Sequence, residues 1–233
     1  MTLKIAEIGL NHMGRSDYFY EYVKCLSKKK IDAITIQIIK KSSLSKSYKS
    51  CYLNDKKIID FIKFAKRKFK FVGVVTDDIE RLEIFKKLNV NFYKLTSGML
   101  KNTMLIKKIL NSSGVKKIYL STGFSSISDI KKVLKKVGKK KINLIHTSFE
   151  KKITKVNLNR INLLKEIFKL PVAYGNHSKY FNCISSSVFF DPCAIFFYVK
   201  LNKNLNYPDK KHAVSIKELD QILYNIKENE KLL

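Results

Sequence analysis

The chain contains 233 residues, 45% of them hydrophobic, and its 47 Lys and Arg against 19 Asp and Glu give a formal net charge of +28. This length suffices for one well-buried domain, and the sequence has no uninterrupted apolar run of about 18 residues that would predict a transmembrane helix. Residues 1–7 lack the basic start, the long apolar run and the cleavage site of a signal peptide, so we expect a cytoplasmic protein.

The excess of positive charge raises the question of a nucleic-acid or membrane-surface partner. The lysines, however, are spread along the whole chain, mainly on the polar faces of helical segments such as 56–70 and 131–141. No nucleic-acid-binding motif accompanies them. We therefore interpret the charge as solvated surface that attracts anionic substrates, and we expect neither nucleic acid nor a membrane as a partner.

Short apolar, β-branched segments alternate with longer amphipathic segments rich in lysine. The predicted strands, in chain order, cover residues 4–8, 33–39, 71–76, 92–96, 117–122, 143–147, 171–174 and 194–201. The predicted helices cover residues 18–27, 56–67, 78–88, 103–110, 127–137, 159–168, 182–190 and 216–229. Residues 40–54, with five serines, are predicted to form a long loop after the second strand.

Eight strand–helix units in strict alternation indicate a parallel sheet covered by helices. Eight units favour closure into a (β/α)8 TIM barrel over an open sheet. We find no linker between domains and expect residues 1–233 to form a single barrel domain. In such a barrel the catalytic groups collect at the carboxyl ends of the strands.

Polar side chains stand at these predicted strand ends. They are Glu7, Asn11 and His12 at the first strand, Gln37 at the second, Lys94 and Ser97 at the fourth, Ser121 at the fifth, His146 at the sixth, His177 at the seventh, and Tyr198 and then Asp209 at the eighth. Acids, amides, hydroxyls, a cation and imidazoles therefore converge on one rim, as expected for a site that binds a polar, anionic substrate.

Most of these residues also have a structural interpretation. Tyr198 lies in a strand crowded with aromatic residues and is expected to pack more than to react. Asp209 follows Pro208, an ordinary turn sequence, and His212 stands beside two lysines, as a solvent-facing loop residue would. Glu7 has few structural explanations, because a carboxylate inside a barrel strand is expensive to bury.

Segments at these strand ends resemble, in order, the motifs of the N-acetylneuraminate (sialic acid) synthase family. Residues 6–14 read AEIGLNHMG, where that family has AEIGxNHxG, and residues 93–98 read YKLTSG, where it has YKIxSGE. Residues 120–123 (LSTG) and 156–158 (VNL) are identical to family motifs. Residues 171–178 read PVAYGNHS, where the family has PVGYSDHT, and residues 203–216 match parts of DKNLPGPDHxxSL. Their order and spacing hold over essentially the whole chain, which therefore resembles the barrel domain of a divergent member.

The resemblance implies an enzyme that condenses phosphoenolpyruvate with an N-acetylated hexosamine such as N-acetylmannosamine, or with a related sugar or its phosphate. Carbon 3 of the enol ester attacks the open-chain aldehyde, water adds at carbon 2, and phosphate leaves, which yields a sialic-acid-like nonulosonic acid. By this resemblance Lys94, Ser97 and Ser121 bind the phosphate. Glu7 is expected to position or deprotonate the attacking water.

The sugar end of the site is implied in the same way. Gln37 and Asp209 are expected to contact sugar hydroxyls, and Asn11 and His12 to contact substrate. The family holds a divalent ion, Mn²⁺ or Mg²⁺, between two histidines. His177 matches the first of them.

Several positions depart from the family. The second metal histidine falls on Tyr198, a poor ligand since a phenol titrates near pH 10. The lysine of KFQ is Thr35, the glutamate after SG is Met99, and the serine and aspartate of YSDH are Gly175 and Asn176. Either Tyr198 polarises the aldehyde in a metal-free variant, or the chain is a degenerate, non-catalytic paralogue that binds a sugar or a partner enzyme.

The family's C-terminal antifreeze-like domain, which helps to close the sugar site, has no counterpart in this sequence. We expect a homodimer or a separate partner chain to supply that closure.

Overall fold

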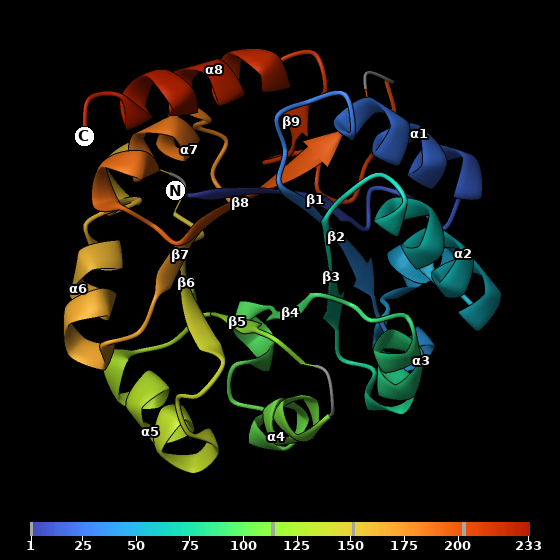
Figure 1. Ribbon diagram of the computed structural model, residues 1–233, viewed down its shortest axis with the longest axis horizontal. Coiled ribbons are helices and arrows are strands. Elements are labelled where there is room, and N and C mark those ends of the chain that lie inside the picture. Colours follow the sequence, from blue (N-terminus) through green and yellow to red (C-terminus); the bar gives the residue numbers. More distant parts are fainter. Residues whose placement is uncertain (1, 113–114, 151, 202–203) are drawn as a thin grey trace.

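The computed structural model describes residues 2–112, 115–150, 152–201 and 204–233. Eight parallel strands pair in chain order, and β1 also pairs with β8, which closes the sheet into a barrel (Figure 1). The strands are β1 (Leu3–Gly9), β2 (Ala33–Ile38), β3 (Phe71–Thr76), β4 (Phe92–Leu95), β5 (Ile118–Ser121), β6 (Ile142–Ser148), β7 (Val172–Asn176) and β8 (Ala194–Lys200). The predicted (β/α)8 TIM barrel is confirmed.

A ring of helices surrounds the strands, each following its strand along the chain (Figure 1). They are α1 (Ser16–Leu26), α2 (Asp55–Lys66), α3 (Leu82–Lys87), α4 (Thr103–Asn111), α5 (Ile127–Val137), α6 (Arg160–Phe168), α7 (Asn182–Ser186) and α8 (Leu219–Glu230). No helix among the described residues is both long and apolar enough to span a membrane.

Two predicted helices are shorter than expected. The segment predicted as 78–88 begins with a 3₁₀ turn, Ile79–Arg81, because Asp78 accepts a hydrogen bond from the Glu80 amide and starts a tighter turn. The segment predicted as 182–190 is α7 followed by a second 3₁₀ turn, Ser187–Phe190. A ninth short strand, β9 (Val214–Ser215), pairs with β8 and was not predicted, since two residues carry no periodicity.

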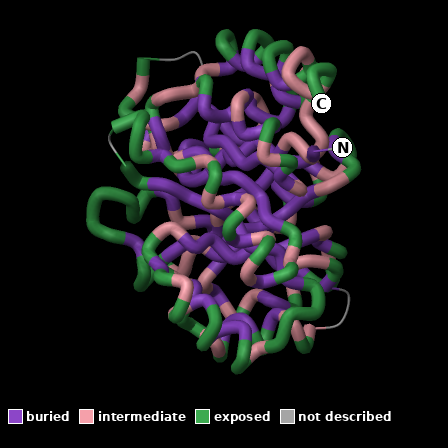
Figure 2. The backbone as a smooth tube through the Cα atoms, turned by 90° about the vertical axis from the view of Figure 1, so that its left-hand side faces the viewer, coloured by how far each residue is buried: buried purple, intermediate pink, exposed green. Residues whose placement is uncertain are grey.

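Alternation along each strand divides the core into two layers. Outward side chains such as Ile34, Val74 and Leu144 pack under the helices. A smaller cluster of inward side chains fills the barrel, and its buried members are Ile5, Ala33, Phe92, Tyr119, Ile145, Ala173, Ala194 and Phe196. In Figure 2 the buried residues gather in the middle of the molecule and the exposed residues lie around its outside. Side chains therefore fill the barrel interior, and functional groups are expected at its carboxyl end.

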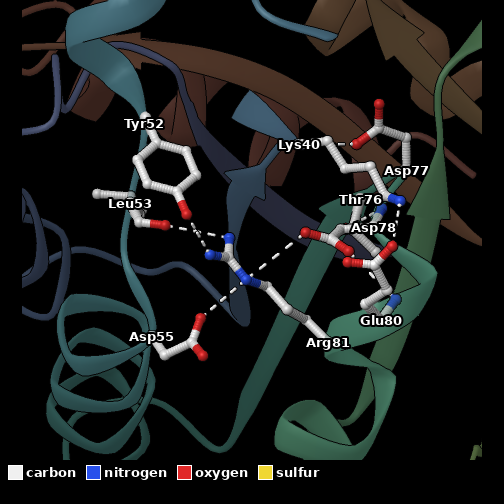
Figure 3. A network of polar contacts seen from close by, with 9 residues as sticks. All are labelled: Lys40, Tyr52, Leu53, Asp55, Thr76, Asp77, Asp78, Glu80 and Arg81. Atoms are coloured by element: carbon white, nitrogen blue, oxygen red, sulfur yellow. Dashed lines mark hydrogen bonds and ion pairs between the residues drawn. The ribbon is translucent and has the colours of Figure 1, made fainter. Parts of the chain in front are cut away.

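The predicted loop at 40–54 contains two 3₁₀ turns, Lys41–Ser43 and Lys46–Cys51, and is fastened at Arg81 (Figure 3). The Arg81 guanidinium donates to the Tyr52 hydroxyl at 2.6 Å and to the Leu53 carbonyl at 3.1 Å. Its Nε lies 2.9 Å from Asp55 and 3.5 Å from the buried Asp78. This network ties the β2–α2 loop to the β3–α3 turn at the carboxyl end of the barrel.

Candidate active site

The polar residues of the site lie directly above the apolar layer of the barrel. Because side chains alternate along a strand, the residue two positions after an inward apolar residue also points inward. Glu7 follows Ile5, Thr35 follows Ala33, Lys94 follows Phe92, Ser121 follows Tyr119, Thr147 follows Ile145 and Tyr198 follows Phe196. The register agrees, since Glu7 stands opposite both Thr35 and Tyr198 on the neighbouring strands.

Glu7 and Lys94 form an ion pair at the centre of this polar layer. The Lys94 ammonium lies 2.5 Å from Glu7 Oε1 and 2.6 Å from Oε2, and both side chains are almost fully buried. The Thr35 hydroxyl donates to Glu7 Oε1 at 3.5 Å. The ammonium also lies 5.4 Å from the centre of the Tyr198 ring. A buried cation inside the barrel can bind an anionic substrate once its carboxylate partner is displaced.

A chain of hydroxyls lies beside this pair. The Ser97 and Ser121 oxygens are 2.8 Å apart, and Ser121 lies 2.7 Å from the Thr147 hydroxyl. The Gly123 amide donates to Ser97 Oγ at 3.0 Å. These rotatable donors stand at three neighbouring strand ends, an arrangement suited to phosphate oxygens. Thr147 also stands at a predicted strand end, but the sequence analysis assigned no role to it.

His177, Tyr198 and His212 form an aromatic cluster on the other side of the mouth. The His177 and His212 rings stack with centres 4.7 Å apart, and Tyr198 meets their rings edge-on at 5.1 and 4.7 Å. Burial lowers the pKa of His212 to about 4 and, with the nearby Lys94 charge, holds the pKa of His177 well below its ordinary value. Burial and the Glu7 and Asp209 charges raise the pKa of Tyr198 well above 10.

His212 was expected to face solvent, and the structure instead places its half-buried ring in this cluster. The residue lies on the connection after β8, where the backbone carbonyl of Asp209 accepts from the amides of His212 and Ala213 and so turns the chain back over the barrel. No local pattern reveals this, because its two lysine neighbours are typical of an exposed loop. Only the return of the chain to β9 and β8 brings His212 onto His177.

Asp209 and Asn11 join the first strand to the last connection. Asp209 Oδ2 accepts from the Leu10 amide at 3.3 Å, and Asn11 both accepts from the Asp209 amide and donates to the Val199 carbonyl. Burial raises the pKa of Asp209 to about 6. Gly9 has φ +57°, and a Cβ there would lie 2.6 Å from Asp209 Oδ2 and from the Tyr198 ring. The glycine is therefore required where these two side chains approach the backbone.

Three further residues from the sequence analysis stand apart from the centre. The His12 ring packs edge-on against Phe61 of α2, and its Nδ1 accepts from the Gly14 amide, so it lies under the helix layer. The His146 side chain points outward from β6, and its Nε2 hydrogen-bonds to the Val156 carbonyl. Gln37 follows the inward Thr35 by two residues and is half-buried at the mouth.

The donors at the mouth do not fit a two-histidine metal centre. The position of the second histidine holds Tyr198, a buried neutral phenol. His212 supplies a second imidazole, but its ring stacks on that of His177 at 27° from parallel. No group of three or more His, Cys, Asp or Glu among the described residues is arranged to hold a metal ion.

Two departures from the family motif have local explanations. Gly175 faces Ile145 and Thr147, and a Cβ there would lie 2.9 Å from both side chains. The space of the family's serine is thus already filled. Asn176 points outward and is held there by two hydrogen bonds, since it accepts from the Tyr174 hydroxyl and donates to the Ser178 carbonyl. Lys203, part of the closing motif, lies outside the described residues.

The whole described barrel has relatives among known proteins. The chain is 34% identical to the uncharacterized protein MJ1065 of Methanocaldococcus jannaschii, with 100% of this chain and 72% of that protein covered. It is 29% identical to the N,N'-diacetyllegionaminic acid synthase of Campylobacter jejuni, with 100% and 77% covered.

Solved structures share the fold. The N-acetylneuraminic acid (sialic acid) synthetase of Leptospira borgpetersenii superposes with a TM-score of 0.90 at 22% identity, with 99% of this chain and 84% of that chain covered. The spore coat polysaccharide biosynthesis protein SpsE of Bacillus subtilis gives 0.85 at 19% identity, with 99% and 68% covered. The sequence profile of the NeuB family matches residues 19–233. The chain therefore belongs to the NeuB family.

Proposed function

We propose that the protein is a sugar-acid synthase that condenses phosphoenolpyruvate with an N-acetylated hexosamine, releasing phosphate and forming a nonulosonic acid. The observation that carries this proposal is the buried Glu7–Lys94 pair beside the Ser97–Ser121–Thr147 hydroxyl chain. The pair joins an acid and a cation within hydrogen-bond reach at the carboxyl end of the barrel. Family membership and the named function of the Campylobacter relative support the same reaction class.

The proposed mechanism begins when the phosphate of phosphoenolpyruvate binds to the Lys94 ammonium and to the hydroxyls of Ser97 and Ser121. Glu7 then loses its partner and becomes available as a base. Carbon 3 of phosphoenolpyruvate forms a bond to the aldehyde carbon. The electrons of this bond come from the double bond between carbons 2 and 3, which leaves carbon 2 electron-poor. Water adds to carbon 2 while Glu7 takes one of its protons. The new hydroxyl at carbon 2 then loses its proton to the departing phosphate as the carbon–oxygen bond to phosphate breaks, so one water proton ends on the former aldehyde oxygen and the other on phosphate.

The aldehyde oxygen gains negative charge in the first step and needs a donor. The Tyr198 hydroxyl is suited to this role, since its raised pKa keeps it protonated at neutral pH. His177 and His212 pack against its ring and fix its direction. Because the donor set does not fit a two-histidine ion site, we derive no step through an Mn²⁺ or Mg²⁺ ion.

Phosphate release from phosphoenolpyruvate, measured with a panel of N-acetylated hexosamines, tests this function. The assay is run with added manganese and again with a chelator. We expect sugar-dependent turnover that falls at least about a hundredfold in Glu7→Gln, whereas Glu83→Gln, an exposed glutamate of α3, leaves the rate unchanged. Turnover that survives chelation supports Tyr198 as the group that stabilises the aldehyde oxygen. Turnover that needs manganese assigns the stabilisation of that oxygen to an ion.

The alternative function is a non-catalytic paralogue that binds a sugar or a partner enzyme. The outward-facing Asn176 favours it, because the residue matched to the family's aspartate bonds to Tyr174 and Ser178 and points away from the barrel interior. Absence of phosphate release under both conditions, together with sugar binding by the folded protein, would establish this alternative.

A further inference from the structure

A cavity of about 220 Å³ opens at the amino end of the barrel, at the opposite end from the candidate active site. Apolar and aromatic side chains from the first five strands form the walls of this amino-end cavity: Leu3, Ile5, Ala33, Phe71, Phe92 and Tyr119. The space exists because β2 contributes only a methyl group, at Ala33, beside strands that contribute rings.

The inner wall of the amino-end cavity is a set of rings in fixed positions. Phe92 and Tyr119 meet edge-on with centres 5.5 Å apart, and Tyr119 meets Phe196 in the same way at 4.9 Å. Gly73 leaves room for the Phe92 ring, since a Cβ there would lie 2.2 Å from it. Lys94 follows Phe92 by two residues, so this layer of rings separates the cavity from the polar layer of the active site.

The opening of the amino-end cavity is positively charged. Lys117 precedes Tyr119 by two residues and so points to the same side of β5, and its ammonium lies 6.0 Å from the centre of the Tyr119 ring. Its neighbour Lys116 also lines the cavity and is exposed. In the described parts of the chain, neither lysine has an ion-pair partner. Asn91 lines the opening too, and its amide oxygen accepts from a β3 amide, which leaves its NH₂ group as a further donor.

The charge at this opening is not neutralised by nearby acids. Burial and the charge of Lys116 lower the pKa of Lys66, which lies at the end of α2. Like charges therefore face each other at the amino end of the barrel, and an anion placed between them would be stabilised.

The volume and the polarity of the walls limit the ligand. An apolar cavity of roughly 150 Å³ in another protein binds benzene. A cavity of about 220 Å³ therefore accommodates one ring with a short side chain. The Tyr119 hydroxyl, the only polar group on the six walls, interacts with the Asn143 side chain. A sugar would leave its hydroxyls unpaired here.

Charge also excludes two other occupants. A second copy of the chain is disfavoured, because each copy carries a net charge of +28 and the two lysine-lined openings would repel each other. An aromatic amino acid is disfavoured, because its ammonium group would lie near Lys116 and Lys117.

We propose that the amino-end cavity is a binding site for a small molecule that consists of one apolar ring, a short side chain and one carboxylate. The ring packs against Phe71, Phe92 and Tyr119. The carboxylate pairs with Lys116 and Lys117 at the opening. This site is separate from the active site, and its ligand is neither a substrate nor a product of the proposed reaction.

A titration followed by ligand-observed NMR tests the proposal without any turnover. The probes are 3-phenylpropionate, its neutral amide 3-phenylpropanamide, and acetate. We expect 3-phenylpropionate to bind at least about tenfold more tightly than either of the others, because only this probe has both the ring and the charge. Equal affinity for the acid and the amide, or for 3-phenylpropionate and acetate, would overturn the proposal.

The double variant Lys116→Gln/Lys117→Gln tests the charged opening. It should weaken binding of 3-phenylpropionate at least about tenfold and leave binding of the amide unchanged. The matched control is Lys131→Gln/Lys132→Gln, which removes the same charge from the exposed face of α5 and should alter binding by less than about twofold. Equal losses in the two double variants would mean that net charge alone attracts the probe, and the site would be refuted.

Ala33→Met tests the apolar part of the site, because its longer side chain occupies the space of the ring. Binding of both the acid and the amide should fall at least about tenfold in the folded variant, as checked by circular dichroism and urea unfolding. Unchanged binding would place the probe elsewhere. If this variant does not fold, the lysine variants and the three probes still decide the question.

The remaining alternatives have outcomes of their own. Saturating phosphoenolpyruvate should not displace 3-phenylpropionate, and displacement would move the probe to the active site. L-Phenylalanine should bind more weakly than 3-phenylpropionate, and the reverse order would contradict the role of the two lysines. A dimer that the probe dissociates in sedimentation experiments would assign the cavity to an interface between copies instead.

Discussion

The stability of the protein depends on keeping Glu7 and Lys94 paired, since each neutralises the buried charge of the other. Removing one partner leaves an unpaired buried charge. We therefore expect Lys94→Met alone to lower the free energy of unfolding by about 3–5 kcal/mol. The double variant Glu7→Gln/Lys94→Met should recover much of that loss, because it leaves no net charge behind. Urea unfolding of the three proteins measures this.

Lys86→Ala provides the control for the preceding experiment. Its ammonium lies 3.3 Å from Glu83, but both side chains are exposed, so water screens the pair. We expect a change of less than about 0.5 kcal/mol. Equal losses in Lys94→Met and Lys86→Ala would show that the buried pair does not hold the barrel mouth as described.

Asp209 makes stability depend on pH. Its pKa is raised by burial from 3.8 to about 6, so the folded state binds the proton more tightly than the unfolded state. Below the unfolded pKa both states are protonated and there is no penalty. As pH rises through about 6 the penalty becomes complete, at about 3 kcal/mol.

Asp209→Asn keeps an oxygen for the Leu10 amide and removes this ionisation. We expect the stability difference, variant minus wild type, to rise by about 3 kcal/mol between pH 3.5 and pH 7. Urea unfolding at several pH values measures this difference. A difference that stays constant with pH would contradict the assigned shift.

At the level of elements, the mouth of the barrel depends on loops that are fastened to one another. The Arg81 side chain contacts four residues, Tyr52, Leu53, Asp55 and Asp78 (Figure 3). We expect Arg81→Ala to lower the free energy of unfolding by about 2–3 kcal/mol. It should also speed hydrogen exchange in residues 40–54 while the strands remain protected.

Lys63→Ala, an exposed change on α2, serves as the comparison for Arg81→Ala. It should leave exchange in residues 40–54 as in the wild type. Uniform acceleration over the whole chain in Arg81→Ala would instead mean that the network supports global stability and does not act on the loop alone.

The sequence predicted the elements well where hydrophobic periodicity is long. Strand β3 and helix α5 have the predicted bounds, and the other strands differ by one or two residues at their ends. Periodicity failed where a turn residue acts locally: Asp78 starts a 3₁₀ turn, which shortens the third helix. It also failed for β9, since two residues show no pattern.

At the scale of the whole molecule, the net charge of +28 is spread over the surface lysines. We expect weak, sequence-independent binding to DNA that falls steeply between about 50 and 200 mM salt, because only counterion release drives it. Fluorescence anisotropy with single- and double-stranded oligonucleotides measures this. Binding that persists at about 0.15 M salt, or that prefers one sequence, would require a nucleic-acid site.

The sequence by itself predicted the barrel, the resemblance to the family and the polar residues at the strand ends. Alternation of strands with helices requires a parallel sheet, and the two-residue period places Glu7, Lys94 and Ser121 on one face. These are local properties of the chain, so they can be read without coordinates.

Only the tertiary structure decided which of the rim residues meet. His212 reaches His177, and Phe124 reaches Phe149, across connections whose paths depend on long-range contacts. The same contacts turn His12 and His146 toward the helix layer, although both stand at strand ends in the sequence. Loops have no periodicity to reveal their course, so closure of the barrel fixes the site where the sequence alone leaves several arrangements open.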